Sequence, residues 1–191
     1  MKRDFFAVGV GASGGGLEAL GKFFDHVPFD PEIAYIVITH IKRDYKSRLG
    51  KLLSAHTNLP IISVRENTVI NPGNIYLMVE NTFVTVEDGE LIVRERMPYE
   101  IVNKAINIFF RSLAADFGEK AVGIVLSGAG DDGLDGAIAI SREGGYIMTQ
   151  TPDSSLFSGM PISIIEHDHP SAILDPDDLA RQLMSYVNNN K

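Results

Sequence analysis

Short β-branched apolar runs alternate along this chain with segments of helical periodicity, and this alternation constrains the fold more than any other feature. Residues 5–10 form an apolar run that enters a glycine-rich turn at residues 11–16. Leucine and phenylalanine then recur at helical spacing as far as Phe24. Residues 33–39 are a nearly continuous apolar run of the kind that is buried on both faces of a parallel sheet. The chain therefore opens with a βαβ unit.

The alternation continues to the C-terminus, with one interruption. We expect further strands at residues 61–64, 121–126, 146–150 and 172–174, and further helices at residues 45–55, 99–118, 134–142, 161–166 and 176–187. In the helix over 99–118, Ile101, Val102 and Ala105 share an apolar face with later residues, and Gly118 supplies the C-cap.

Residues 75–94 interrupt the pattern with short strands at 75–79, 82–86 and 90–93. Asp88-Gly89 between the last two is a strong signal for a hairpin turn. The sequence therefore predicts one doubly wound α/β domain over residues 1–191. We expect its sheet to be mostly parallel, with helices on both faces and a small antiparallel hairpin region near residues 75–94.

Composition excludes several classes of function. The chain has 17 basic and 25 acidic residues and a formal net charge of -8, which disfavours binding to a nucleic-acid backbone. It has no cysteine, so it has neither disulfides nor a thiol nucleophile. No apolar stretch approaches the roughly 20 residues of a membrane-spanning helix. We read no export signal, and therefore expect a soluble, cytoplasmic protein that neither inserts in a membrane nor binds nucleic acid.

Three predicted strands are followed by residues whose side chains can act in catalysis. Ser13 follows the first strand, His40 follows the second, and Asp132 follows the strand at 121–126. Loops at the C-terminal ends of parallel strands converge on one edge of a sheet, where ligands bind. Serine, histidine and aspartate at that edge are the parts of a hydrolytic triad. Each residue also has a simpler interpretation. Ser13 could cap a helix, His40 could be a loop residue, and Asp132 could cap the next helix, as could Asp131 or Asp135.

The first glycine-rich turn matches two incompatible motifs. Residues 9–14 fit the Gly-x-Gly-x-x-Gly dinucleotide fingerprint, and residues 11–15 fit the Gly-x-Ser-x-Gly nucleophile elbow. A dinucleotide site needs an acidic residue at the end of the second strand, and here that strand ends in Thr39-His40. The elbow explains the histidine better, so we expect no nicotinamide, flavin or other cofactor. A cofactor-dependent oxidoreductase, which would bind NAD or flavin at residues 9–14, is the hypothesis that we rank last.

Two further alternatives involve the segment at residues 167–170. An ordinary α/β-hydrolase order would use His167 or His169 as the base, but that fold places its elbow after several strands, and this elbow follows the first. The same two histidines lack an obvious third ligand for zinc, so we expect no metal site. The segment reads more simply as a polar loop.

The combination of motifs resembles the CheB family of chemotaxis methylesterases over nearly the whole chain, from about Phe5 to Val187. The resemblance rests on the turn at residues 8–15, the strand ending in His40, residues 123–133 with their Ser-Gly-Ala-Gly-Asp-Asp-Gly turn, and Gly159-Met160-Pro161. Supporting segments lie at residues 70–76 and 109–114.

The resemblance implies an enzyme that hydrolyses glutamate γ-methyl esters on the cytoplasmic domains of methyl-accepting chemoreceptors and releases methanol, with glutamine deamidation in some members. It implies a triad of Ser13, His40 and Asp132, with no metal or organic cofactor. Backbone amides would hold the oxyanion, with Gly14, Ala129 and Gly130 as candidates. Substrate would approach over the loops that follow these strands, with Thr39 and Met160 as rim candidates.

The sequence departs from the family pattern near the expected site. Gly14 stands where the family commonly has Thr, Thr39 where it has Gln, and Ala129 where it has Met. Ile41-Lys42 replaces Met-Pro after the histidine. The Arg-Pro-Ser stretch before the long helix is also altered. These changes motivate a second hypothesis, a docking module of a signalling protein that retains the fold with weakened catalysis.

Many family members carry an N-terminal receiver domain, whereas this chain starts at the first catalytic strand. We therefore expect no regulation by phosphorylation on this chain. It acts alone or belongs to a longer protein, such as a fusion with a methyltransferase domain.

Overall fold

The computed structural model describes residues 3–41 and 47–191. Within these residues, seven strands form one parallel sheet in the order β10-β9-β8-β1-β2-β5-β3. The bounds are β1 (Phe6–Ala12), β2 (Ile33–Thr39), β3 (Ile61–Val64), β5 (Ile75–Met78), β8 (Ala121–Val125), β9 (Tyr146–Gln150) and β10 (Ala172–Leu174). β1 is central and buried along its whole length.

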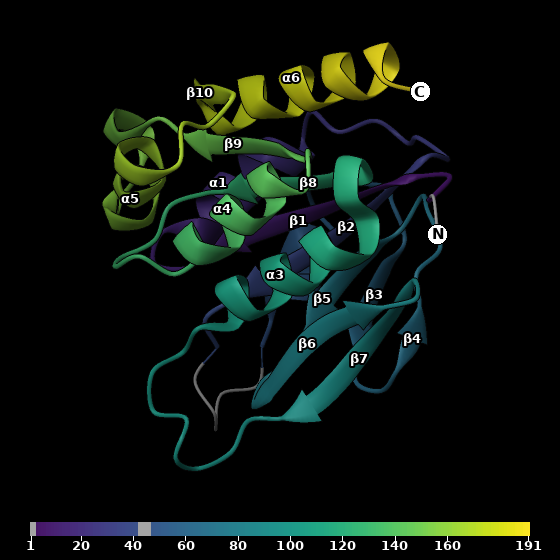
Figure 1. The fold of residues 1–191 in the computed structure, drawn as a ribbon, viewed down its shortest axis with the longest axis vertical. Helices are drawn as coiled ribbons and strands as arrows, with labels where there is room; N and C mark the ends of the chain where they lie inside the picture. The colour runs from purple at the N-terminus through teal and green to yellow at the C-terminus, as the bar shows by residue number, and fades with distance from the viewer. Residues whose placement is uncertain (1–2, 42–46) are drawn as a thin grey trace.

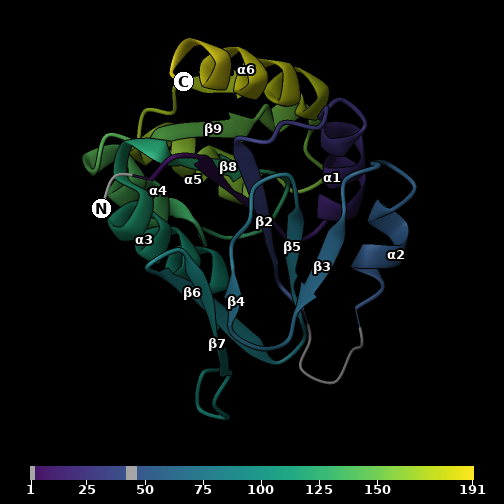
Figure 2. The same cartoon turned by 90° about the vertical axis from the view of Figure 1, so that its right-hand side faces the viewer.

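Helices cover both faces of this sheet (Figures 1 and 2). The helices α1 (Gly16–Phe24), α2 (Leu49–Leu53) and α6 (Pro176–Asn189) pack on one face, and α3 (Ala105–Phe117), α4 (Leu134–Arg142) and α5 (Gly159–His167) pack on the other. Each face has its own cluster of fully buried apolar side chains. The alternating pattern in the sequence thus becomes three layers with two cores.

A second sheet packs against α3. It is antiparallel, with the order β4-β7-β6, and consists of β4 (Thr68–Val69), β6 (Thr82–Glu87) and β7 (Glu90–Glu95). Asp88 and Gly89 both have positive φ, as a two-residue hairpin turn requires. The predicted doubly wound fold with a small antiparallel region is therefore confirmed. The prediction differs at residues 75–78, which form β5 in the parallel sheet because they pair with β2 and β3.

The long helix begins later than its apolar pattern predicts. It starts at Ala105, and Ile101 and Val102, which we expected on its buried face, are 85% and 68% exposed. Its end at Gly118, which has φ 51°, agrees with the prediction. The predicted start of the second helix at residue 45 lies outside the described residues, and the observed α2 is limited to Leu49–Leu53. Short 3-10 turns at Gly118–Lys120 and Pro152–Ser154 complete the structure.

α3 and α4 approach each other at a glycine. A Cβ atom at Gly136 would collide with the Cβ of Phe110 and lie 3.3 Å from the Asn107 carbonyl oxygen. Neither obstacle is the flexible end of a side chain. Gly136 therefore sets how closely α4 can pack on α3.

We predict that Gly136→Ala lowers the free energy of unfolding by about 1–3 kcal/mol, since the added methyl forces these helices apart. The matched control is Gly50→Ala in α2, where a Cβ would make an ordinary 3.4 Å contact with Leu77. That variant should be neutral or stabilised by up to about 1 kcal/mol. Urea unfolding measures both values, and equal effects at the two glycines would contradict this account.

Candidate active site

The parallel register of β1 with β2 places Ser13 beside His40. Ala12, the last residue of β1, pairs with Thr39, the last residue of β2. Ser13 and His40 are therefore the next residues at the same edge of the sheet, and Oγ of Ser13 lies 3.0 Å from Nδ1 of His40. Both side chains are partly exposed. A hydroxyl bonded to an imidazole thus faces solvent at the C-terminal ends of the strands.

Asp132 extends this pair into a hydrogen-bonded chain of three residues. Nε2 of His40 lies 2.7 Å from Oδ2 of Asp132, whose side chain is only 4% exposed. Because a carboxylate only accepts hydrogen bonds, Nε2 of His40 carries the hydrogen. The lone pair of Nδ1 then points at the Ser13 hydroxyl, so this tautomer can accept the serine proton.

The first turn of α3 holds the Asp132 carboxylate in place. The backbone N–H of Ile106 donates to Oδ2 and the backbone N–H of Asn107 donates to Oδ1, both at 3.0 Å. Because α3 starts at Ala105, these first-turn N–H groups have no partner within the helix. They and the positive end of the helix dipole stabilise a buried negative charge. The late start of α3 is thus what lets the helix bind Asp132.

Asn107 is a site residue that the sequence did not single out. It is buried, and its Oδ1 accepts hydrogen bonds of 3.0 Å from the backbone N–H groups of Gly133 and Gly136. It therefore joins α3 to the turn that carries Asp132. In the sequence, Asn107 is a polar residue among apolar ones, and no motif marks it.

The structure separates Asp132 from its acidic neighbours. Asp131 is exposed and pairs with Lys104 at 2.6 Å, and this hydrogen bond lowers the pKa of the Asp131 carboxyl. Asp135, in the first turn of α4, pairs with Arg111 at 2.9 Å. Among Asp131, Asp132 and Asp135, Asp132 is the residue whose carboxylate bonds to His40.

The turns after β1 and β8 carry the backbone N–H groups that the sequence offered as oxyanion donors. In the part of the chain that the structure describes, the N–H groups of Gly14, Ala129 and Gly130 donate to no other protein group. The N–H of Gly128, by contrast, donates to the carbonyl of Phe157 at 2.8 Å. Gly14 directly follows the serine, and Ala129 and Gly130 are exposed. These three N–H groups can still receive a ligand.

The glycines of the first turn serve close packing. A Cβ atom at Gly14 would lie 2.8 Å from the Phe157 ring, and one at Gly15 would lie 2.6 Å from Cβ of Leu156. In a dinucleotide site, the glycines instead let a pyrophosphate approach the backbone at this turn. Here the segment around residues 156–157 covers the turn, so this geometry favours the nucleophile elbow.

Thr39 and Met160, the two rim candidates, differ in position. Thr39 ends β2 and is partly exposed. Met160 is fully buried, and its sulfur fills the space beside Gly128, where any Cβ atom would collide with it. Met160 N also donates to the Gly128 carbonyl at 2.8 Å. The prediction of Met160 as a rim residue is therefore wrong: its side chain packs against the Gly128 turn and is not exposed.

His167 is the last residue of α5, where Nδ1 bonds to the carbonyl of Ser163 at 3.0 Å. His169 follows the helix, with a positive φ of 61°. Among residues 3–41 and 47–191, no group of three or more His, Cys, Asp or Glu side chains is arranged to hold a metal ion.

None of the helices in these ranges has the length and apolar character needed to cross a membrane.

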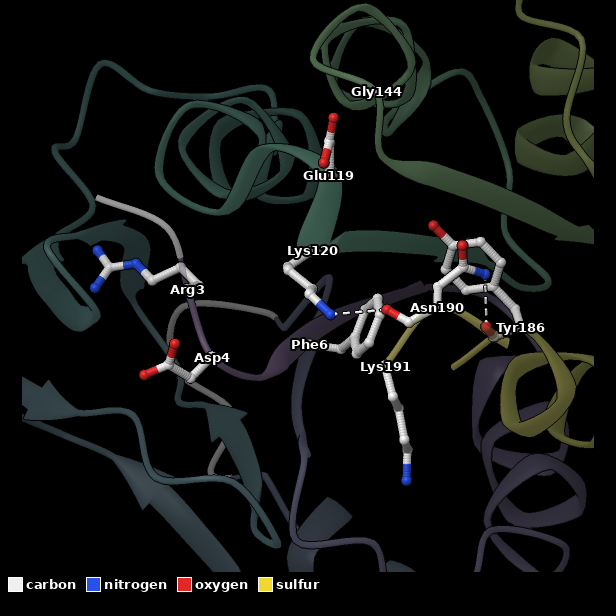
Figure 3. Close-up of a pocket in the computed structure, with 9 residues that line it drawn as sticks. All are labelled: Arg3, Asp4, Phe6, Glu119, Lys120, Gly144, Tyr186, Asn190 and Lys191. Atoms are coloured by element: carbon white, nitrogen blue, oxygen red, sulfur yellow. Dashed lines mark hydrogen bonds between the residues drawn. The ribbon is translucent and has the colours of Figure 1, made fainter. Parts of the chain in front are cut away.

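A pocket of about 480 Å³ lies at the opposite edge of the sheet (Figure 3). Phe6, the first residue of β1, lines it, whereas Ser13 follows the other end of β1. Its cations are already engaged. Lys120 Nζ lies 4.0 Å from the Phe6 ring centroid and donates to the Asn190 carbonyl at 2.9 Å, and Lys191 pairs with Asp30 at 3.1 Å. This pocket is separate from the Ser13–His40–Asp132 cluster.

Comparison with known proteins connects this geometry to a family. The sequence profile described as CheB methylesterase matches residues 8–183. The chain belongs to the CheB methylesterase family. The family resemblance expected from the sequence is thereby confirmed.

Relatives carry names in keeping with this family. A Burkholderia lata protein named protein-glutamate methylesterase/protein-glutamine glutaminase 2 is 30% identical over 181 residues, which are 94% of this chain and 53% of that protein. A Methanosarcina acetivorans protein of the same name is 27% identical over 186 residues, with 93% of this chain and 52% of that protein covered. The chain thus spans about half the length of these curated relatives.

The fold also matches a solved structure. The CheB methylesterase catalytic domain of Thermotoga maritima superposes with a TM-score of 0.87 at 20% identity, covering 97% of this chain and 100% of that one. At this identity, the likeness shows that the CheB fold is shared.

We predict that Asn107→Leu lowers the free energy of unfolding by about 2–3 kcal/mol, because it leaves the Gly133 and Gly136 N–H groups buried without an acceptor. The matched control is Arg111→Leu, at an exposed position of the same helix, which removes only a surface ion pair with Asp135 and should cost about 1 kcal/mol or less. Urea unfolding of the two variants tests this. A loss for Asn107→Leu no greater than that for Arg111→Leu would show that the bonds to Gly133 and Gly136 contribute little.

Proposed function

We propose that this chain is a serine-dependent protein-glutamate methylesterase. Its substrates would be glutamate γ-methyl esters on the cytoplasmic domains of methyl-accepting chemoreceptors. The observation that carries the proposal is the hydrogen-bonded chain from Ser13 through His40 to Asp132, in a member of the CheB methylesterase family. In this proposal residues 1–191 act as one catalytic domain in the cytoplasm.

The first half of the reaction transfers the glutamyl group to the enzyme. Ser13 Oγ attacks the ester carbonyl while Nδ1 of His40 takes the hydroxyl proton, and Asp132 stabilises the imidazolium that forms. The tetrahedral intermediate then collapses, the bond to the methoxy oxygen breaks, and His40 returns the proton to release methanol. A covalent glutamyl ester of Ser13 remains.

The second half regenerates the serine. His40 takes a proton from water as the water oxygen attacks the glutamyl ester, and returning that proton to Oγ of Ser13 releases the glutamate side chain. When the leaving group is ammonia rather than methanol, the same steps deamidate glutamine. The second half of the relatives' name supports this additional activity.

Both tetrahedral intermediates place a negative charge on the former carbonyl oxygen. We assign its stabilisation to the N–H groups of Gly14 and Ala129, with Gly130 as a further candidate. These donors come from the turns after β1 and β8, which are neighbouring strands. Removing a donor of this type from a hydrolase typically costs roughly 10²–10³ in kcat. Backbone donors also explain how the site can work with Gly14 and Ala129 in place of larger residues.

The partial exposure of Ser13 and His40 supports a macromolecular substrate. A side chain presented on a helical receptor can reach an open edge of the sheet more easily than a deep pocket. The proposed partners are therefore chemoreceptor cytoplasmic domains, and a methyltransferase domain where the chain belongs to a fusion. Thr39 would contact the substrate at the rim, and the buried Met160 would support the Gly128 turn.

We predict that Ser13→Ala and His40→Ala each lower methanol release from a methylated receptor fragment by about 10³-fold or more, as expected when a triad member is removed. Neither change should prevent folding, because both side chains are partly exposed. Thermal unfolding provides the control. Unchanged turnover in either folded variant would refute the proposed mechanism.

A further inference from the structure

We propose that Ser127 is a positioning residue that holds the Gly14 N–H in the orientation needed to stabilise the oxyanion. This inference rests on the proposed esterase function and adds a residue that does not touch the reacting atoms. Ser127 follows β8 and is 1% exposed.

Ser127 binds the nucleophile turn at two points. Its backbone carbonyl accepts the N–H of Ser13 at 2.9 Å, and its hydroxyl donates to the carbonyl of Gly14 at 2.7 Å. The approach is close, because a Cβ atom at Gly15 would lie 2.8 Å from Oγ of Ser127. The serine hydroxyl is thus in direct contact with the turn that carries the nucleophile.

These contacts determine the orientation of the Gly14 peptide groups. The N–H of Gly14 belongs to the peptide between Ser13 and Gly14, whose carbonyl accepts the N–H of Gly16 at 2.8 Å. The next peptide is held at its carbonyl by the Ser127 hydroxyl. Glycine has the most freedom of any residue to rotate between two peptide planes. Without the Ser127 hydroxyl, the peptide that follows Gly14 would lose its bond, and the peptide that carries the Gly14 N–H would be held at its carbonyl by Gly16 alone.

The same hydroxyl connects the turn to the segment that covers it. Ser127 Oγ accepts the N–H of Phe157 at 3.1 Å, and the Phe157 ring packs over Gly14. The hydroxyl therefore links two elements that are far apart in sequence. Both contribute to the position of Gly14.

Gln150 in turn fixes Ser127. It is 2% exposed, its Oε1 accepts the Ser127 N–H at 2.8 Å, and its Nε2 donates to the Ser154 carbonyl at 2.9 Å. A fully bonded buried polar network of this kind favours one arrangement over others. Hydrogen bonds thus connect Gln150, through Ser127, to the carbonyl of Gly14.

The test compares Ser127→Ala with Ser112→Ala. Ser112 is a matched control because its hydroxyl also donates to a backbone carbonyl, that of Phe109 at 2.8 Å, and accepts a backbone N–H, that of Val86 at 3.0 Å. It joins α3 to β6, away from the nucleophile turn. Both variants should melt at a lower temperature than the wild type. At an assay temperature where both variants are folded, Ser127→Ala should have lost activity and Ser112→Ala should not.

For Ser127→Ala we expect kcat for methanol release from a methylated receptor fragment to fall about 10- to 100-fold, with KM within about twofold of the wild type. Ser127→Thr keeps the hydroxyl and should restore most of kcat. A boronic acid that forms a tetrahedral adduct with Ser13 should lose affinity in the same proportion as kcat/KM falls. If Ser127→Ala does not fold, Ser127→Cys takes its place in the test. Because a thiol is a weaker donor than a hydroxyl, its kcat should fall by more than about twofold, and an unchanged kcat would overturn the proposal.

The proposal is overturned if Ser127→Ala keeps kcat within about twofold of the wild type, as Ser112→Ala should. It is also overturned if KM rises while kcat is unchanged. These results would leave the proposed function intact, because the wild-type protein would still release methanol. A wild-type protein that neither releases methanol nor forms a covalent adduct at Ser13 would overturn both proposals.

Discussion

The site depends on the alignment of parallel strands around β1. The pairing of Ala12 with Thr39 brings the ends of β1 and β2 level, so that Ser13 and His40 emerge side by side. β1 and β8 are also level, with Gly11 opposite Val125, and this places the Ser127 turn against Ser13. A shift of one residue in either pairing would turn these side chains to the opposite face. Close packing opposes such a shift of β1: a Cβ atom in place of Gly9 would lie 2.8 Å from the Phe110 ring, so the neighbouring Val8 does not fit there.

The second requirement is the buried carboxylate of Asp132. The fold compensates for the free-energy cost of removing this charge from water. An ionised group that is removed from water needs hydrogen bonds and favourable charge around it. Asp132 obtains two backbone N–H groups from α3 and one from the His40 ring. Asn107 then fixes the turn that follows by accepting from Gly133 and Gly136. Asp132 and its turn are therefore anchored at the N-termini of α3 and α4.

Much of this arrangement could be predicted from the sequence, because its signals are local. The buried run at residues 33–39, the glycine turns and Asp88-Gly89 each reflect a short-range preference that the structure retains. The position of Ser13, His40 and Asp132 at strand ends followed from the general geometry of parallel sheets. Their catalytic roles remain a proposal, as do those of the oxyanion candidates.

Other features could not be predicted, because they depend on contacts between distant residues. The apolar Ile101 and Val102 continue the helical period, yet the helix starts at Ala105, where its free N–H groups meet Asp132. Asn107 and Ser127 look like ordinary polar residues until their partners are known. The Asn107 side chain accepts from Gly133, 26 positions away, and the Ser127 hydroxyl donates to Gly14, 113 positions away. β5 joins the parallel sheet through its pairing with β2 and β3, which no local pattern reveals.

The most direct test of the central claim is covalent labelling of Ser13 by a fluorophosphonate, located by peptide mass spectrometry. A serine activated by an imidazole displaces fluoride and forms a stable phosphonyl adduct, whereas a serine on a docking surface does not. We predict one adduct at Ser13, with a labelling rate that falls by about 10²-fold or more in His40→Gln, because the general base is lost. The absence of an adduct at Ser13 from the wild-type protein, or equal labelling rates in the two proteins, would contradict the account.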